Sequence, residues 1–215
     1  MLKANAYGSG PNQIAQFLAK IHPDYIGVAH IDEGIALRDA GVKQPILVLY
    51  TKIEDAQVLA KFNLEPVVYS MEYLKALVVL QDLNQRLNIH IEFDTGMHRL
   101  GFAPEEAGKI GNMVSASIHK AVGVMSHLSS ADDVKLDGFT QKQIQLFHDS
   151  SDTLENSLGH SCVKHLCNSI GTLRFPDAHF DMVRIGIGLY GNVIDRTLRS
   201  SNNRNQSAYD QLMSE

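Results

Sequence analysis

The sequence predicts an α/β protein built on a parallel sheet. Short runs of apolar residues alternate with segments of helical periodicity along most of the chain. These runs lack strict polar alternation, which is typical of parallel strands that are covered on both faces. A strand followed by a helix recurs seven times. This pattern leaves a doubly wound sheet and a (β/α)₈ barrel both open.

Seven segments are expected to form the strands. Each is short and consists mainly of apolar side chains. In chain order, the expected strands are 25–29, 46–49, 66–69, 89–93, 121–125, 163–166 and 182–187. Leu2 and Lys3 would be the stub of one further strand.

Helices are expected between these strands. Pro11 suits the first position of a helix whose apolar residues recur at 14, 17, 18 and 21. Asp32 is expected to cap a helix that stops at Gly41. Ser70 leads another helix, and residues 133–158 form a long one.

Composition predicts one globular domain over residues 1–195. Of the 215 residues, 44% are hydrophobic and 20% charged. Residues 196–215 form a polar tail that is expected to be disordered. The net charge of −5 argues against nucleic acid or an anionic membrane surface as partners.

Localisation follows from what the sequence does not contain. No apolar run approaches the roughly 20 residues that span a bilayer. The first residues lack a signal-peptide pattern, and the two cysteines are too few for a disulfide framework. We therefore expect a cytoplasmic protein without a membrane partner.

Lys3 is the first candidate catalytic residue. It ends the strand stub, and a glycine-bearing turn and a helix follow it. In a barrel this junction lies at the carboxyl ends of the strands, where active sites are found. Partial desolvation there lowers the pKa of an amine and makes it nucleophilic toward an aldehyde cofactor. On position alone, a solvated surface lysine remains the alternative.

Five motifs, in order along the chain, resemble those of alanine racemases. Lys-Ala-Asn-Ala-Tyr-Gly-x-Gly at residues 3–10 resembles the family's pyridoxal-phosphate lysine motif. The other four are Asp-Thr-Gly-Met-His-Arg-Leu-Gly-Phe at 94–102, Met-Ser-His-Leu-Ser at 125–129, Asn-Ser-Ile-Gly-Thr-Leu-Arg at 168–174 and the segment 180–191. The resemblance implies a TIM-type (β/α)₈ barrel. In this chain most of the first strand would be missing, and the family's C-terminal β-domain would be absent.

The resemblance also implies a role for individual residues. Lys3 would bond covalently to pyridoxal 5'-phosphate and act as a proton-transfer base. Arg99 would reach the cofactor's phenolic oxygen or the substrate carboxylate. Arg184 would donate to the pyridine nitrogen and keep it unprotonated, because a guanidinium does not readily release a proton. The other implied cofactor contacts are Tyr7, Ser169, Gly186 and Ile187 at the phosphate, His127 against the ring and Asn168 in the pocket wall.

Glu92 has a supporting role in this interpretation. It stands seven residues before Arg99, where many family members carry a carbamylated lysine. A glutamate supplies the same negative charge without CO₂. We expect a bidentate Arg99–Glu92 pair, with some other partner for Glu92 as the alternative.

The implied function is the interconversion of L- and D-alanine for peptidoglycan synthesis. The family is homodimeric, and its second base is a tyrosine of the β-domain, donated across the dimer. No residue of this sequence can be assigned to that base, so a cofactor-binding fragment or a pyridoxal-phosphate carrier without turnover remains the alternative.

Three other patterns point to different chemistry and carry less weight. Gly186–Gly191 fits G-x-G-x-x-G but lies near the end of the chain rather than in a first βαβ unit. Asp94-Thr95-Gly96 matches the aspartic-protease tripeptide but occurs once, whereas that chemistry needs two carboxylates. The His-x-Cys pairs at 160–162 and 165–167 lack the usual zinc spacing, so no metal site is expected.

Overall fold

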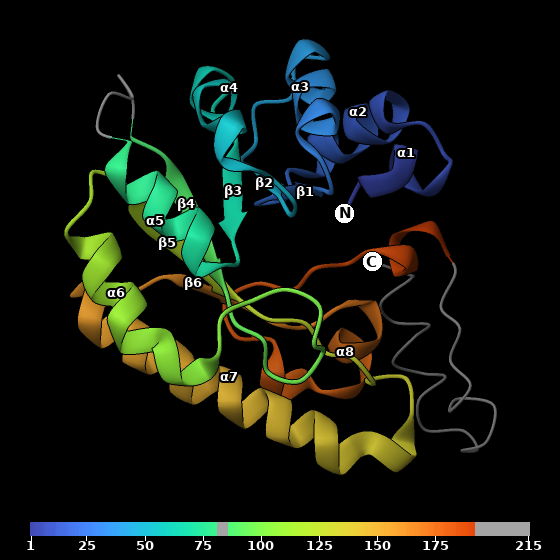
Figure 1. The fold of residues 1–215 in the computed structure, drawn as a ribbon. Coiled ribbons are helices and arrows are strands. Elements are labelled where there is room, and N and C mark those ends of the chain that lie inside the picture. The colour runs from blue at the N-terminus through green and yellow to red at the C-terminus, as the bar shows by residue number, and fades with distance from the viewer. Residues whose placement is uncertain (81–85, 192–215) are drawn as a thin grey trace.

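The computed structural model describes residues 1–80 and 86–191. Six strands form one sheet in the order β1-β2-β3-β4-β5-β6, and all neighbours are parallel. The sheet curls into part of a barrel, and helices cover its outer face (Figure 1). Of the two architectures that the strand–helix pattern left open, the barrel is therefore confirmed, while the expected polar tail lies outside the described residues.

The strands are short and almost entirely buried. All residues of β1, β2 and β3 are buried. The register pairs Ile26 with Ile46 and Val67 with His90. The bounds are β1 Ile26–Val28, β2 Ile46–Val48, β3 Glu65–Val68, β4 Asn88–Glu92, β5 Lys120–Met125 and β6 Val163–His165.

Eight α-helices in the described part of the chain connect and cover the strands. The Ser70 hydroxyl accepts a hydrogen bond from the Tyr73 amide, as expected for a helix cap. The bounds are α1 Lys3–Tyr7, α2 Pro11–Ile21, α3 Ile31–Asp39, α4 Ala56–Lys61, α5 Met71–Val79, α6 Ala107–Ser115, α7 Asp137–Leu158 and α8 Ser169–Arg174. Single 3₁₀ turns lie at Ile53–Asp55, Pro104–Glu106, Val134–Leu136, Pro176–Ala178 and Ile187–Tyr190.

The two faces of the sheet differ in character. Successive strand residues point to opposite faces. Ile46 and Val48 belong to the large apolar cluster, whereas Leu47 packs with Val67 and Met125 in a small separate cluster. The same alternation places polar side chains inside the barrel, among them Glu65, His90 and His165. These residues lie close to the site described below.

The expected strand at 182–187 is wrong as a strand. Only Met182 forms an isolated bridge, with His165. Farther along, the Gly186 amide donates to the Ser169 hydroxyl rather than to a strand neighbour. The Arg184 amide still donates to the Cys167 carbonyl, so the pairing beside β6 ends before Gly186, whose amide bonds to a side chain.

Short backbone contacts link the two edges of the curled sheet. The Leu2 amide donates to the Gly27 carbonyl at 2.7 Å, so the expected strand stub lies beside β1. The Met1 nitrogen donates to the Ile185 carbonyl at 2.8 Å. Residues from opposite ends of the described chain thus meet beside the site (Figure 1).

Two helix starts differ from those expected. The helix assigned to Asp32 begins at Ile31, because Glu33 accepts hydrogen bonds from the Ala29 and His30 amides and makes His30 the cap. The long helix begins at Asp137, because Asp133 caps a 3₁₀ turn before it. Among the described helices, none is long and apolar enough to cross a membrane.

Candidate active site

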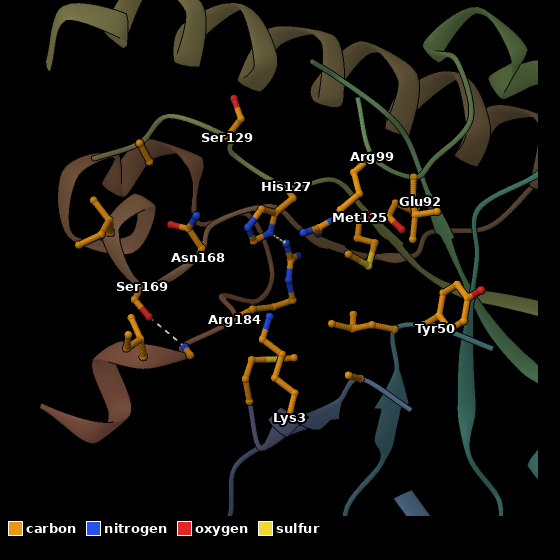
Figure 2. Close-up of a pocket in the computed structure, with 18 of the residues that line it drawn as sticks. Lys3, Tyr50, Glu92, Arg99, Met125, His127, Ser129, Asn168, Ser169 and Arg184 are labelled. Atoms are coloured by element: carbon orange, nitrogen blue, oxygen red, sulfur yellow. Dashed lines mark hydrogen bonds between the residues drawn. The ribbon is translucent and has the colours of Figure 1, made fainter. Parts of the chain in front are cut away.

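A cavity of about 660 Å³ opens at the carboxyl ends of the strands. Its size is within the usual range for small-molecule and cofactor sites. Residues that follow or end β1, β2, β4, β5 and β6 line it, as Figure 2 shows. All ten residues that the sequence assigned to the site lie on its wall: Lys3, Tyr7, Glu92, Arg99, His127, Asn168, Ser169, Arg184, Gly186 and Ile187.

Lys3 begins a left-handed turn. Ala4, Asn5, Ala6 and Tyr7 all have φ between 53° and 56°. This backbone region costs roughly 1–2 kcal/mol for each residue with a Cβ. Strain of this kind persists only where surrounding contacts fix it, and it is common at functional sites.

Glu33 supplies one such contact. Its carboxylate accepts from the Ala4 amide at 2.7 Å and also caps α3 through the amides of Ala29 and His30. One side chain therefore ties the strained turn after Lys3 to the start of α3.

Replacing this carboxylate is expected to destabilise the fold. In Glu33→Ala, three backbone amides lose a charged acceptor, so the free energy of unfolding should fall by about 1.5–3 kcal/mol. Denaturant unfolding measures this change. Asp32→Ala is the control, because Asp32 is an exposed neighbour on the same helix and its loss should change stability by less than about 0.5 kcal/mol. Equal stability of the two variants would show that Glu33 does not hold the turn.

The surroundings of Lys3 favour its neutral amine. Burial lowers the pKa of Lys3, the positive charges of Arg99 and Arg184 lower it further, and Glu33 acts in the opposite direction. Figure 2 shows the Lys3 side chain extending into the cavity toward Arg184. A lysine in this setting is a stronger nucleophile at neutral pH than a solvated one.

Arg184 is held by acceptors on two sides. Its Nη1 donates to the Nδ1 and the carbonyl of His165, at 2.9 and 2.7 Å. Its Nη2 donates to the carbonyls of Ser126 and Leu166 and to Nδ1 of His127. Within the described part of the chain, the Nε–H has no protein acceptor, and Arg184 lines the cavity.

The charge states around Arg184 follow from these contacts. Burial lowers the pKa of Arg184 to about 10, which still leaves it cationic at neutral pH. Burial and the nearby cations lower the pKa of His127 to about 3. His127 is therefore neutral at physiological pH, and its Nδ1 accepts from the guanidinium (Figure 2).

A small polar cradle, formed by Ser169 and the turn at Gly186, lies at one end of the cavity. The Ser169 hydroxyl oxygen is 2.9 Å from the Gly186 amide and 3.1 Å from the Gly188 amide (Figure 2). A Cβ at Gly186 would lie 2.7 Å from the Tyr7 hydroxyl, so only glycine leaves this space open. Hydroxyls and amides gathered at a turn form a suitable site for an anion.

The expected direct pair between Glu92 and Arg99 is not formed. No ion pair within 4.0 Å joins them among the described residues, although both line the cavity (Figure 2). Burial raises the pKa of Glu92, while Arg184 and Arg99 act in the opposite direction. Arg99 is exposed on the loop after β4, whereas Glu92 is buried at the end of that strand.

Asn168 has a structural role beside the cavity. Its side-chain oxygen accepts from the Gly171 amide, and its side-chain nitrogen donates to the Leu128 carbonyl.

The sequence did not indicate the contributions of Glu33, His165 and Gly188. His165 could have been noticed as a polar residue in an expected strand, but the Glu33 contact depends on how α3 meets the turn.

The fold and the cavity together define the class of this domain. A curled parallel sheet with helices outside and a lysine-bearing cavity at its carboxyl ends defines a (β/α)-barrel domain. The family model for the N-terminal domain of alanine racemase matches residues 1–193. The chain belongs to this family.

Curated relatives agree with this assignment. An alanine racemase of Oceanobacillus iheyensis is 37% identical over 195 residues, covering 89% of this chain and 52% of the relative. An alanine racemase of Carboxydothermus hydrogenoformans is 37% identical over 198 residues, covering 91% and 54%. The chain thus spans about half the length of the curated relatives it matches.

Solved structures show the same fold. An alanine racemase of Clostridium difficile 630 in complex with cycloserine has a TM-score of 0.85 and 34% identity, covering 91% of this chain and 54% of that one. The Bacillus anthracis alanine racemase with bound L-Ala-P has a TM-score of 0.83 and 31% identity, covering 92% and 52%. The TIM-like barrel implied by the sequence motifs is therefore confirmed.

Proposed function

We propose that this chain supplies the cofactor site of a pyridoxal-phosphate-dependent alanine racemase. The observation that carries the proposal is the joint placement of Lys3 and Arg184 in one cavity. Lys3 is a lysine with a lowered pKa, and Arg184 keeps one N–H without an acceptor among the residues that the structure describes. The two groups match an aldehyde and a pyridine nitrogen on one planar ligand.

The residues present fit the cofactor. Lys3 would attach to its aldehyde, and Arg184 Nε–H would donate to the pyridine nitrogen. The Tyr7 hydroxyl, Ser169 and the turn at Gly186 and Ile187 would hold the phosphate, in the space that a Cβ at Gly186 would fill. His127 would contact the ring, and Asn168 would close the wall. When bound, the cofactor withdraws electrons from the substrate α-carbon and makes its proton acidic.

The chain's own residues then handle the proton and the carboxylate. The neutral Lys3 amine would take or return the α-proton on one face of the substrate. Arg99, an exposed residue that lines the cavity, would bind the substrate carboxylate. Arg184 remains a cation throughout, so the pyridine nitrogen receives a hydrogen bond without a full proton.

Substrate and setting are inferred from the relatives. Those above are named alanine racemases, and two of their structures hold cycloserine and L-Ala-P. We therefore propose alanine as the substrate. From the motif resemblance we also propose a homodimer as the working assembly and a cytoplasmic enzyme that supplies D-alanine to peptidoglycan.

Exchange of the substrate α-hydrogen tests this function. The chain is incubated in D₂O with pyridoxal phosphate and either L- or D-alanine, and the Cα–H signal is followed by NMR. Because Lys3 serves only one face, one enantiomer should exchange its α-hydrogen faster than the other. Cofactor attachment without exchange of either enantiomer would favour a carrier or an inactive fragment instead.

Filling the cradle should weaken cofactor binding. In Gly186→Ala the new Cβ would lie 2.7 Å from the Tyr7 hydroxyl, in the space proposed for the phosphate. We expect the Kd for pyridoxal phosphate to rise about tenfold or more, in line with the loss of one charge-assisted hydrogen bond. An absorbance titration measures this Kd. Gly138→Ala, where a Cβ meets nothing within 4 Å, is the control, and equal Kd values would place the phosphate elsewhere.

A further inference from the structure

A continuous chain of hydrogen bonds runs from Arg184 through the inside of the barrel. Arg184 Nη1 is 2.9 Å from Nδ1 of His165, and Nε2 of His165 is 2.9 Å from Nδ1 of His90. His90 Nε2 is 3.1 Å from the Glu65 carboxylate. Both histidines are fully buried, and Glu65 and Arg184 are 8% exposed.

The chemistry of the groups fixes the direction of every bond. A guanidinium only donates, so Nδ1 of His165 must accept and its ring proton lies on Nε2. That proton can only go to Nδ1 of His90, which therefore accepts in turn. His90 then carries its own proton on Nε2 and donates it to Glu65. Each donor faces an acceptor, with a cation at one end and a carboxylate at the other.

Residues packed around His90 and Glu65 support this series of hydrogen bonds. A Cβ at Gly123, on the neighbouring strand β5, would overlap the His90 ring, so the glycine provides the space for it. Asn88 donates to the other Glu65 oxygen at 3.3 Å, and the Tyr25 ring packs edge-on against His90. Burial raises the pKa of Glu65, but the hydrogen bonds from His90, Asn88 and Tyr25 outweigh it and lower the pKa overall.

We propose that Glu65, His90 and His165 are positioning residues that hold the Arg184 guanidinium in one orientation, with its Nε–H directed into the cavity. Without this series of hydrogen bonds, His165 could turn or exchange its ring proton, and Arg184 would lose one of its fixed acceptors. The proposal rests on the proposed function in one respect, namely that a pyridine nitrogen is what the Nε–H meets. The orientation itself is a property of the protein without cofactor.

Imidazole nitrogen NMR on the cofactor-free chain tests the direction of the bonds. The protein is labelled with ¹⁵N in its ten histidines, and His90→Phe and His165→Phe assign the signals of the two rings. Both His90 and His165 should carry a proton on Nε2 and none on Nδ1. A proton on Nδ1 of either ring, or two protons on one ring, would overturn the proposal.

Solvent exchange of the Arg184 Nη1 protons tests the positioning role. Exchange should be about tenfold faster or more in His90→Phe and Glu65→Leu, which leave a buried donor without its acceptor. Glu65→Gln keeps an acceptor oxygen, so its exchange should stay close to that of the unchanged chain. His119→Phe is the matched control, because His119 is buried with two hydrogen bonds of its own, to Leu77 and Leu87.

The outcomes separate this proposal from the proposed function. His119→Phe should lower stability without changing Arg184 exchange, whereas equal exchange rates in His90→Phe, Glu65→Leu and the unchanged chain would contradict the positioning role. If pyridoxal phosphate cannot be attached to Lys3 in the unchanged chain, the proposed function fails. The exchange rates still decide whether the hydrogen-bond chain positions Arg184, because they are measured without cofactor.

Discussion

Lys3→Ala is expected to abolish exchange of the alanine α-hydrogen. The variant lacks both the amine that would attach to the cofactor and the base that would move the proton. General-base catalysis by one side chain contributes about 10²–10⁴-fold, so the exchange rate should fall by at least that factor. Burial and the charges of Arg99 and Arg184 lower the pKa of Lys3, which raises the neutral fraction of its amine at a given pH. Deuterium incorporation followed by NMR gives the rate.

Lys52→Ala is the matched control for this variant. Lys52 lies on the loop after β2 and is exposed, so its removal should leave the exchange rate unchanged. Exchange that persists in Lys3→Ala but disappears in another lysine variant would move the catalytic base elsewhere. Cofactor attached to a residue other than Lys3 would lead to the same conclusion.

Arg184→Met should cause the largest loss of stability. The substitution removes the donor to three carbonyls and to two histidine nitrogens in the barrel interior. It also removes the cation that acts most strongly to lower the pKa of Glu92. Removing one partner from a buried charged network costs about 3–5 kcal/mol. The free energy of unfolding from denaturant titration should fall by this amount.

Arg38→Met provides the comparison. Arg38 also donates four hydrogen bonds to backbone carbonyls, but it is only half-buried, so water can replace the arginine. Its loss should cost about 1–2 kcal/mol. If the two variants were equally stable, the interior network around Arg184 would not carry the energy assigned to it.

Much of the fold could be anticipated from local pattern. Six of the seven expected strands are present within a residue or two, because short buried β-branched runs report directly on a parallel sheet. The seventh pairs with β6 only through an isolated bridge at Met182, and farther along the Gly186 amide bonds to Ser169, which lies seventeen positions away. No local pattern in the sequence indicates such a contact.

The motifs predicted the residues that line the site, but not the interior residues that hold them in place. Each assigned residue lies on the cavity wall, since the motifs follow the ends of strands and those ends converge in a barrel. His90 and Glu65 sit in separate strands, and only the register of β3 with β4 brings them together. The Arg99–Glu92 pair was expected from the family resemblance, but in the structure Arg99 is exposed and the two side chains form no ion pair.

Trapping the cofactor on the protein tests the central claim most directly. The chain is mixed with pyridoxal phosphate, reduced with borohydride and digested, and the modified peptide is identified by mass spectrometry. One cofactor on Lys3, with an absorbance change that Lys3→Ala lacks, is the expected result. No attachment, or attachment spread over exposed lysines in equal measure, would show that this cavity is not a pyridoxal-phosphate site.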